Sequence, residues 1–385
     1  MPNFNFDFFK RNHADDLIDG LIEKVVAAYP PARCERIKAR AEATWKTGIS
    51  PDKDRISYVA FDNTAPEEPK VPDDADGLQN ELILQLKLIL QHAEVDDDYY
   101  PGFPSGLEQV TMPSLFGCIK ESALKSNHVK PVIQSPSDVY SLPPAEVREG
   151  FVCHEMLRRM AYKHRRTNGR ISVYITDMQG PFSCAAQIWG IEDFMCALYE
   201  NPNEAHHLLS LCTDAIIQYY RAMYTAVGDD LIPIHCPYDL WIPKDCGVAV
   251  SDDFLAINSA NIVREFSLPY MDKIGEVFGG VITHSCGAVD HVVKALNEMK
   301  TLKGINFGSS ETNLPAFVRE YNPDMTLIVH QTGGIACNGL PLLSGEEHFK
   351  LCKDVYKATG AKLIAIYNYD GKNPDASLWQ QAVRL

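Results

Sequence analysis

Long apolar runs are missing from this sequence. No stretch of about 18 consecutive apolar residues occurs, and a membrane-spanning helix needs that length. The first nine residues also lack the basic start and apolar centre of a secretory signal peptide. We therefore expect a protein that makes no membrane contact and is located in the cytoplasm.

Basic residues are few relative to acidic ones. The chain has 36 Lys and Arg against 51 Asp and Glu, so its formal net charge is −15 at pH 7. This charge repels phosphate backbones and anionic lipids, so we expect neither nucleic acid nor a membrane as a partner. The 11 cysteines have no short regular spacing. This pattern predicts reduced thiols, as in a cytoplasm, rather than a disulfide framework.

Several well-known catalytic and nucleotide-binding motifs are absent. The sequence contains neither a Walker-type phosphate loop nor a Gly-x-Gly-x-x-Gly fingerprint. It also lacks the Gly-x-Ser-x-Gly motif that carries the nucleophile of many serine hydrolases. These absences leave nucleotide binding and that class of hydrolase without support.

The chain does contain an alternation of short β-rich runs with longer amphipathic stretches. It predicts parallel strands joined by helical crossovers, and eight such units favour a closed (β/α)8 TIM barrel. We place this barrel at residues 55–385 and an N-terminal helical extension at residues 1–54, with helices at 15–28 and 32–46. The predicted strands are 56–61, 97–103, 171–176, 231–235, 280–284, 304–307, 326–330 and 363–367.

The loops that follow these strands hold most of the chemically useful side chains. In such barrels the catalytic groups sit at the C-terminal ends of the strands. Polar, aromatic and metal-capable residues gather in the corresponding segments 177–181, 237–241, 284–287, 308–311, 331–334 and 368–371.

His284 and Cys286 form the most specific candidate pair. Residues two apart in a strand face the same side, so an imidazole and a thiolate could share one Zn²⁺. The alternative is a buried, hydrogen-bonded histidine beside a small apolar cysteine. A zinc site needs three or four protein ligands, and we assign Cys337 as the third. The other candidates near predicted strand ends are Glu311, His330 and His235.

Other polar residues at the same predicted edge are candidates for catalysis and substrate binding. Asp239 and His330 are the expected proton donors if the reaction needs one, although a loop aspartate bound to backbone amides is an equally common arrangement. We interpret Asp252 and Asp253 as capping and turn residues before an apolar helix. Substrate binding is assigned to Gln179, Tyr238, Trp241, Asn306 and Tyr369.

Three segments resemble the uroporphyrinogen-decarboxylase-like superfamily. Residues 258–270 are similar to its "SP…F.EF..PY" helix, and they are followed, as in that family, by the Gly-Gly-Val-Ile-Thr-His-Ser-Cys-Gly run that ends at residue 287. Residues 180–182 resemble the family's "GPF" turn, and residues 115–118 resemble its "AFG" segment. The resemblance spans roughly residues 55–385 and implies the same barrel fold.

That superfamily contains two classes of enzyme, and the sequence is more similar to the second. True uroporphyrinogen decarboxylases carry an arginine-containing N-terminal motif for the substrate carboxylates, and the region around residues 64–66 has nothing like it. Cobalamin-dependent methyltransferases, including methylcobalamin:coenzyme M enzymes and demethylating enzymes of anaerobes, share the His-x-Cys element, which binds zinc there. Their later cysteine near the eighth strand is absent here, where residues 366–371 carry tyrosine and asparagine.

The resemblance implies a methyltransferase that acts on a small-molecule substrate with zinc at His284 and Cys286. The chain has no cobalamin-binding motif of its own, so a separate corrinoid protein would have to supply the corrinoid. Two alternatives stay open: a cofactor-independent decarboxylase or other lyase of a small carboxylate, and a small-molecule-binding barrel without catalysis. A homodimer is a further expectation from the superfamily.

Overall fold

Parallel strands form the centre of the protein. The computed structural model describes residues 4–8, 10–49, 55–62, 72, 74–106, 109–120, 129–235, 239–331 and 336–369, without the side chains of residues 61, 62, 368 and 369. The strands of this described part are β1 (Ser57–Asp62), β2 (Gly102–Phe103), β3 (Ser172–Ile175), β4 (Leu231–His235), β5 (Val248–Ser251), β6 (Val281–His284), β7 (Leu302–Gly308), β8 (Thr326–His330) and β9 (Leu363–Tyr369).

These strands belong to two sheets, and every strand pair in both is parallel. One sheet has the order β1-β9-β8-β7-β6-β5, and the other has the order β2-β3-β4. A parallel bridge between Gln179 and Ser251 joins the segment after β3 to β5. On the other side, the amide of Asp98 donates to the carbonyl of Tyr58 at 2.9 Å and joins the segment before β2 to β1.

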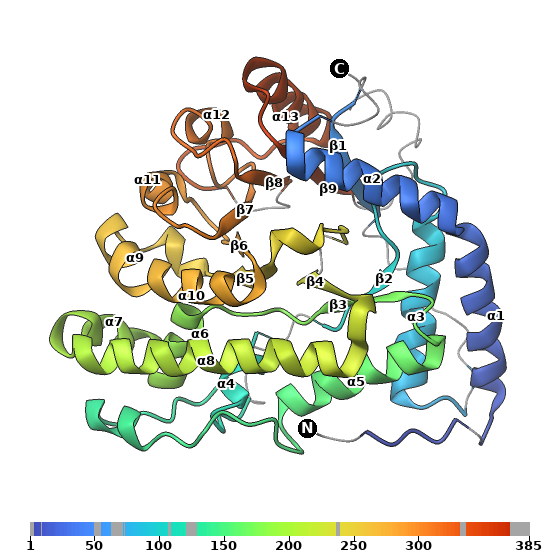
Figure 1. Cartoon of the computed structure of the whole chain (residues 1–385), viewed down its shortest axis with the longest axis horizontal. Helices are drawn as coiled ribbons and strands as arrows, with labels where there is room; N and C mark the ends of the chain where they lie inside the picture. Colours follow the sequence, from blue (N-terminus) through green and yellow to red (C-terminus); the bar gives the residue numbers. More distant parts are fainter. Residues whose placement is uncertain are drawn as a thin grey trace.

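Helices surround the strands on the outside (Figure 1). Most of them lie between consecutive strands in the chain, as parallel crossovers require. The helices are α1 (His13–Ala28), α2 (Pro31–Thr47), α3 (Gly77–His92), α4 (Thr111–Ser114), α5 (Val152–Thr167), α6 (Pro181–Trp189), α7 (Ile191–Glu200), α8 (Pro202–Val227), α9 (Ala260–Phe266), α10 (Leu268–Phe278), α11 (Val293–Leu296), α12 (Leu314–Phe317) and α13 (Gly345–Thr359). The α/β class with parallel strands is therefore confirmed.

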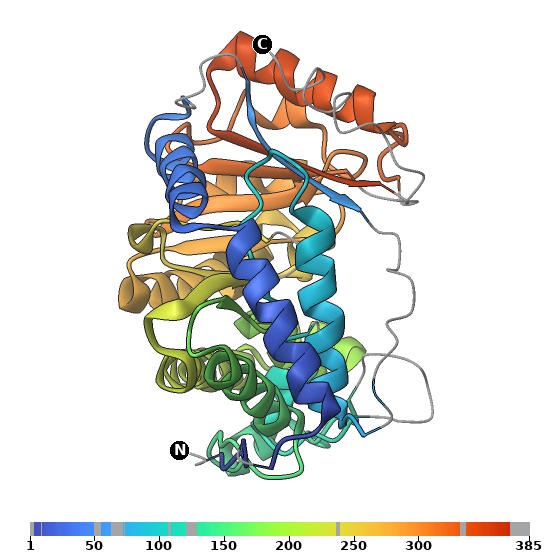
Figure 2. The ribbon, with the colours of Figure 1, turned by 90° about the vertical axis from the view of Figure 1, so that its right-hand side faces the viewer.

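The two predicted N-terminal helices correspond to α1 and α2, and α1 packs along α3 (Figure 2). Each of α1 and α3 begins with a capping box, formed by Asn12 with Asp15 and by Asp76 with Gln79. The side chains of Asn12 and Gln79 also exchange two hydrogen bonds of 3.0 Å. These contacts fix the start of α1 beside the start of α3.

All eight predicted strands are found, but the prediction missed β5. Its four residues are all buried, but three apolar residues followed by a serine and two aspartates gave no clear strand signal. The prediction for residues 97–103 was too long, because β2 contains only Gly102 and Phe103. The missed strand matters because it carries Asp252 and Asp253 to the edge where β6 also ends.

Among the described residues, no helix is both long and apolar enough to cross a membrane.

Candidate active site

The ends of β5, β6 and β7 place three polar side chains in one row. Ser251 pairs with His284 in the parallel register of β5 and β6, and His284 pairs with Asn306 in the register of β6 and β7. Chain direction alone therefore brings these residues to the C-terminal edge of the sheet. The turn after His284 contains Cys286 and Gly287, and Gly287 has a φ of +92° that favours glycine.

Three potential metal ligands meet at this turn. His284 Nε2 lies 3.2 Å from Cys286 Sγ and 3.7 Å from Asp253 Oδ1. The backbone amide of Cys286 donates to Asp253 Oδ1 at 2.8 Å. One nitrogen, one sulfur and one oxygen ligand atom thus lie within 4.8 Å of one another. This donor set suits Zn²⁺, which accepts all three atom types.

The surroundings of the Cys286 thiol disfavour its thiolate form. Although Cys286 is exposed at the surface, desolvation, together with the carboxylates of Asp253 and Glu311, raises the pKa of its thiol to about 12. The thiol is therefore protonated at neutral pH, and it can donate to His284 Nε2. A bound cation would favour the thiolate instead, because it opposes the same negative field.

Glu311 contributes a buried carboxylate to the loop after β7. The residue is 2% exposed, and its Oε2 has no hydrogen-bond partner among the described residues. A buried carboxylate oxygen without a donor is costly. Its electrostatic effect on the Cys286 thiol places this charge at the same site.

The other ring nitrogen of His284 contacts Asn306. His284 Nδ1 lies 2.5 Å from Asn306 Oδ1, and the amide nitrogen of Asn306 donates to the carbonyl of Ile328 at 2.8 Å. The same amide nitrogen lies 3.2 Å from His330 Nδ1. His330 is the last residue of β8, so this chain of contacts continues the polar row into a further strand.

A second set of polar side chains extends the site toward β3. Asp177 accepts hydrogen bonds from Gln179 Nε2 at 3.1 Å and from Ser251 Oγ at 3.0 Å. Ser251 Oγ lies 3.3 Å from His235 Nε2, and the ring of His235 lies 6.1 Å from that of His284. Strands β3 to β8 therefore contribute to one polar region.

Two histidines of this region are neutral at physiological pH. Burial, with a smaller contribution from the nearby His284, lowers the pKa of His235 to about 4 and that of His330 to about 3. At neutral pH neither side chain carries the extra proton that an imidazolium acid would release.

Asp252 contacts the backbone of the turn that contains His284 and Cys286. Its amide donates to the carbonyl of His284 at 2.7 Å, and the hydroxyl of Ser267 donates to its carboxylate at 2.5 Å. Burial raises the pKa of Asp252 to about 7. The capping interpretation of Asp252 and Asp253 missed this arrangement, and the signal that could have revealed it was their position directly after β5.

The structure brings together His235, Glu311 and five more of the residues that the sequence singled out. These five lie at the edge formed by the ends of β3, β6, β7 and β8, and they are Gln179, His284, Cys286, Asn306 and His330.

Asp239 lies beside the segment that precedes β2. Its carbonyl accepts from the amide of Tyr100 at 2.9 Å, and Leu240 bridges Tyr99. Burial raises the pKa of the Asp239 carboxyl to about 7, and its φ of +36° is unusual for a residue other than glycine. No contact of Asp239 with the His284 turn occurs in the described chain.

The remaining predicted residues are outside the cluster or outside the described residues. Trp241 is half-buried and packs against the core. The amide of Cys337 donates to the carbonyl of Ser310 at 2.9 Å, and its thiol is not part of the three-residue group. Tyr369 is the last residue of β9, and its side chain lies outside the described part, as does Tyr238.

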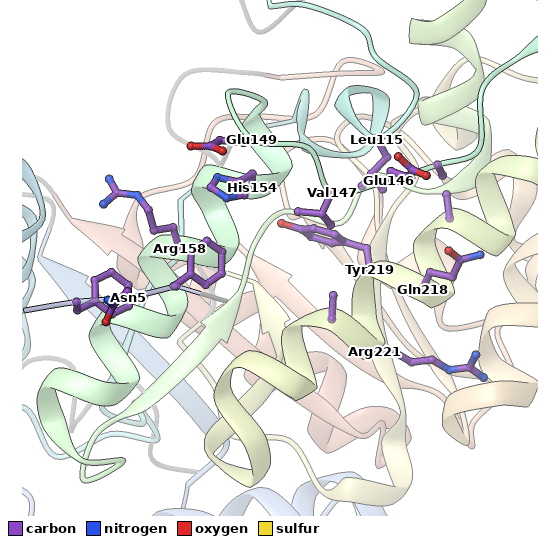
Figure 3. Close-up of a pocket in the computed structure, with 15 residues that line it drawn as sticks. Asn5, Leu115, Glu146, Val147, Glu149, His154, Arg158, Gln218, Tyr219 and Arg221 are labelled. Carbon is purple, nitrogen blue, oxygen red and sulfur yellow. The ribbon is translucent and has the colours of Figure 1, made fainter. Parts of the chain in front are cut away.

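A separate pocket of about 890 Å³ lies between the N-terminal segment, α5 and α8 (Figure 3). Its lining includes Phe4, His154, Arg158 and Tyr219. None of the residues around the His284 turn lines it. This pocket is therefore distinct from the part of the molecule that holds the His284 turn.

Comparisons with known proteins agree with the motifs found in the sequence. Residues 113–234 match the family Uroporphyrinogen decarboxylase (URO-D). No curated protein sequence matches the chain significantly. A solved structure described as a methyltransferase from Methanosarcina mazei is similar, with a TM-score of 0.60 and 16% sequence identity over 90% of this chain and 97% of that one. The family match supports the resemblance to the uroporphyrinogen-decarboxylase-like superfamily, and the structural similarity shows that the two chains share a fold.

Proposed function

We propose that this protein is a zinc-dependent methyltransferase that acts with a corrinoid carried on a separate protein. The observation that carries the proposal is the group formed by Asp253, His284 and Cys286 at the end of β6. The fold similarity to a methyltransferase supports it. We also propose that the two sheets are parts of one closed (β/α)8 barrel, because the contacts at Ser251 and Asp98 connect them on both sides.

In this proposal His284 Nε2, Cys286 Sγ and Asp253 Oδ1 hold the zinc ion. Asp253 takes the place that the sequence had suggested for Cys337, since its carboxylate already contacts the other two residues. When bound, zinc would lower the pKa of a substrate thiol or polarise a methyl donor. Asn306 fixes the ring of His284, and Asp252 holds the backbone of the same residue.

The substrate would lie over the C-terminal edge of the strands, where Gln179 and His330 offer polar groups. The partner corrinoid protein would dock over this same edge, because the methyl group must pass between the two proteins. The negatively charged carboxylates of Asp253 and Glu311 lie at this edge. We expect them to favour a cation at the site over a further anion.

The lyase alternative receives less support from the geometry. It needed Asp239 or His330 as a proton donor. Asp239 contacts the segment before β2, and His330 is neutral at physiological pH because burial lowers its pKa to about 3.

The test is the zinc content of the purified protein, measured by elemental analysis before and after zinc supplementation. We expect about one zinc ion per chain in the wild type and none in Cys286→Ser. The matched control is Cys196→Ser, which removes another exposed cysteine, on α7. Zinc-loaded wild type should also transfer a methyl group between methylcobalamin and a thiol. A wild-type protein that stays free of zinc would contradict the proposal.

A further inference from the structure

The side chain of Asn306 contacts both His284 and His330. Its oxygen faces His284 Nδ1 at 2.5 Å, and its amide nitrogen lies 2.8 Å from the carbonyl of Ile328 and 3.2 Å from His330 Nδ1. Asn306 is 1% exposed, so water does not compete for these contacts. Each neighbour therefore constrains the orientation of the amide.

The carbonyl of Ile328 decides which way the Asn306 amide points. A backbone carbonyl can only accept a hydrogen bond, so the atom that faces it must be the amide nitrogen. The atom that faces His284 is then the oxygen, which can only accept. His284 Nδ1 must consequently carry the hydrogen, and His284 Nε2 is an acceptor. His284 Nε2 lies 3.2 Å from Cys286 Sγ, and an S–H group can donate to an acceptor nitrogen in this position.

The second hydrogen of the same amide nitrogen decides the state of His330. It points to His330 Nδ1, which must therefore accept. A neutral imidazole has one donor and one acceptor nitrogen, so His330 carries its hydrogen on Nε2. Two neighbouring histidines, whose rings lie 6.1 Å apart, thus have opposite tautomers.

We propose that Asn306 is a positioning residue that sets His284 as an acceptor at Nε2 and His330 as a hydrogen-bond donor at Nε2. The first role prepares His284 to bind a cation with Cys286 and Asp253, and so rests on the proposed function. The second role fixes the tautomer of a neutral histidine at the same edge of the strands. Neither role is the direct substrate contact that the sequence suggested for Asn306.

Two substitutions of Asn306 separate the two roles. Asn306→Asp keeps an acceptor for His284 Nδ1 but loses the donor to His330 and to the carbonyl of Ile328, so of the two histidines we expect only His330 to change its tautomer. Asn306→Leu loses both contacts, and we expect both histidines to lose their fixed tautomers. Asn258→Leu is the matched control, because Asn258 is also buried and its side-chain amide donates to the carbonyl of Phe254.

The experiment is nitrogen NMR of the ¹⁵N-histidine-labelled full chain, assigned with His284→Gln and His330→Gln. In the wild type we expect hydrogen on Nδ1 of His284 and on Nε2 of His330. A wild-type protein with hydrogen on Nε2 of His284, or on Nδ1 of His330, would overturn the proposal. This measurement needs no metal, so it decides the tautomers even if the zinc proposal fails.

Zinc affinity provides the second readout. Loss of a partner of this kind behind a metal-binding histidine weakens metal binding by about 10- to 100-fold. We expect this loss in Asn306→Leu and a change of less than about threefold in Asn306→Asp and in the control. Equal zinc affinity in Asn306→Leu and wild type would refute the positioning role while leaving the zinc site intact. If the wild type binds no zinc, the proposed function fails separately.

Discussion

Two acidic clusters in this protein have opposite surroundings. Beside β1, the buried carboxylate of Asp98 is bound by Arg40 at 2.6 Å, by Arg55 at 2.9 Å and by the hydroxyl of Ser57 at 2.7 Å. At the end of β6, Asp253 contacts a backbone amide and a histidine, and Glu311 Oε2 lacks a hydrogen-bond partner in the described chain.

The difference lies in the counter-charges. Asp98 has two guanidinium groups within 3 Å. The described contacts of Asp253 and Glu311 include no lysine or arginine. A buried acidic group with its own cations holds the fold together, whereas acidic groups without them, such as the partly exposed Asp253 and the buried Glu311, leave room for a cation from outside. We therefore interpret the first cluster as structural and the second as functional.

The largest expected effect comes from the structural cluster. Asp98→Ala would leave Arg40 and Arg55 without their shared carboxylate, and removing one partner of a buried ion pair costs about 3–5 kcal/mol. We expect a fall of this size in the free energy of unfolding, measured by urea denaturation. Asp96→Ala is the control, since Asp96 is a neighbouring but exposed carboxylate that also contacts Arg40. Equal free energies of unfolding in Asp98→Ala and Asp96→Ala would contradict the structural role of the cluster beside β1.

Substitution in the functional cluster should instead lower zinc affinity and change the free energy of unfolding only slightly. Asp253→Asn keeps an acceptor for the amide of Cys286, so we expect the free energy of unfolding to change by less than about 1 kcal/mol. Zinc affinity should fall at least about tenfold, because a charged ligand is lost. Titration with a competing chelator measures this, with the exposed Asp229→Asn as control. A stability loss as large as that of Asp98→Ala would show that Asp253 is structural.

Zinc binding should also depend on pH. The pKa of the Cys286 thiol is raised to about 12, chiefly by desolvation, so the thiol must release a proton when it binds zinc. Apparent zinc affinity should then rise by about tenfold per pH unit between pH 6 and 8 from this thiol alone. We expect Cys286→Ser to lose this dependence along with most of its affinity. A wild-type affinity that is independent of pH would exclude the thiol as a ligand.

The smallest effect is a pH dependence of stability caused by buried neutral histidines. Burial lowers the pKa of His348 to about 3, whereas in the unfolded chain a histidine has a pKa of about 6.5. Between these values the unfolded state binds more protons, so stability falls as pH falls. The slope is at most about 1.4 kcal/mol per pH unit for one histidine. His348→Gln should reduce the slope, while the exposed His13→Gln should not.

The order of strands and the main reactive turn were predictable from the sequence. Strand and helix periods are local properties, and all eight predicted strands appear in the structure. The pair His284 and Cys286 was predictable because both residues lie at the end of a predicted strand and are two apart in sequence, although Cys286 belongs to the turn after β6 and not to the strand. The helical crossovers then determined which strand ends share an edge.

The parts that the sequence did not predict depend on contacts between distant segments. Asp253 joins the site only because β5, a strand of four residues, pairs with β6. Asp239 follows β4 in sequence, yet the chain turns toward Tyr100 and carries it to the segment before β2. Packing decides which distant segment such a residue contacts, and the sequence around the residue gives no signal of it.

The most direct test of the zinc proposal is X-ray absorption spectroscopy of the zinc-loaded wild-type protein. We predict one sulfur ligand at about 2.3 Å and nitrogen or oxygen ligands at about 2.0–2.2 Å. The sulfur signal should vanish in Cys286→Ser and persist in Cys337→Ser. Two sulfur ligands would assign Cys337 to the site in place of Asp253. A spectrum without sulfur would contradict a zinc centre at the His284 turn.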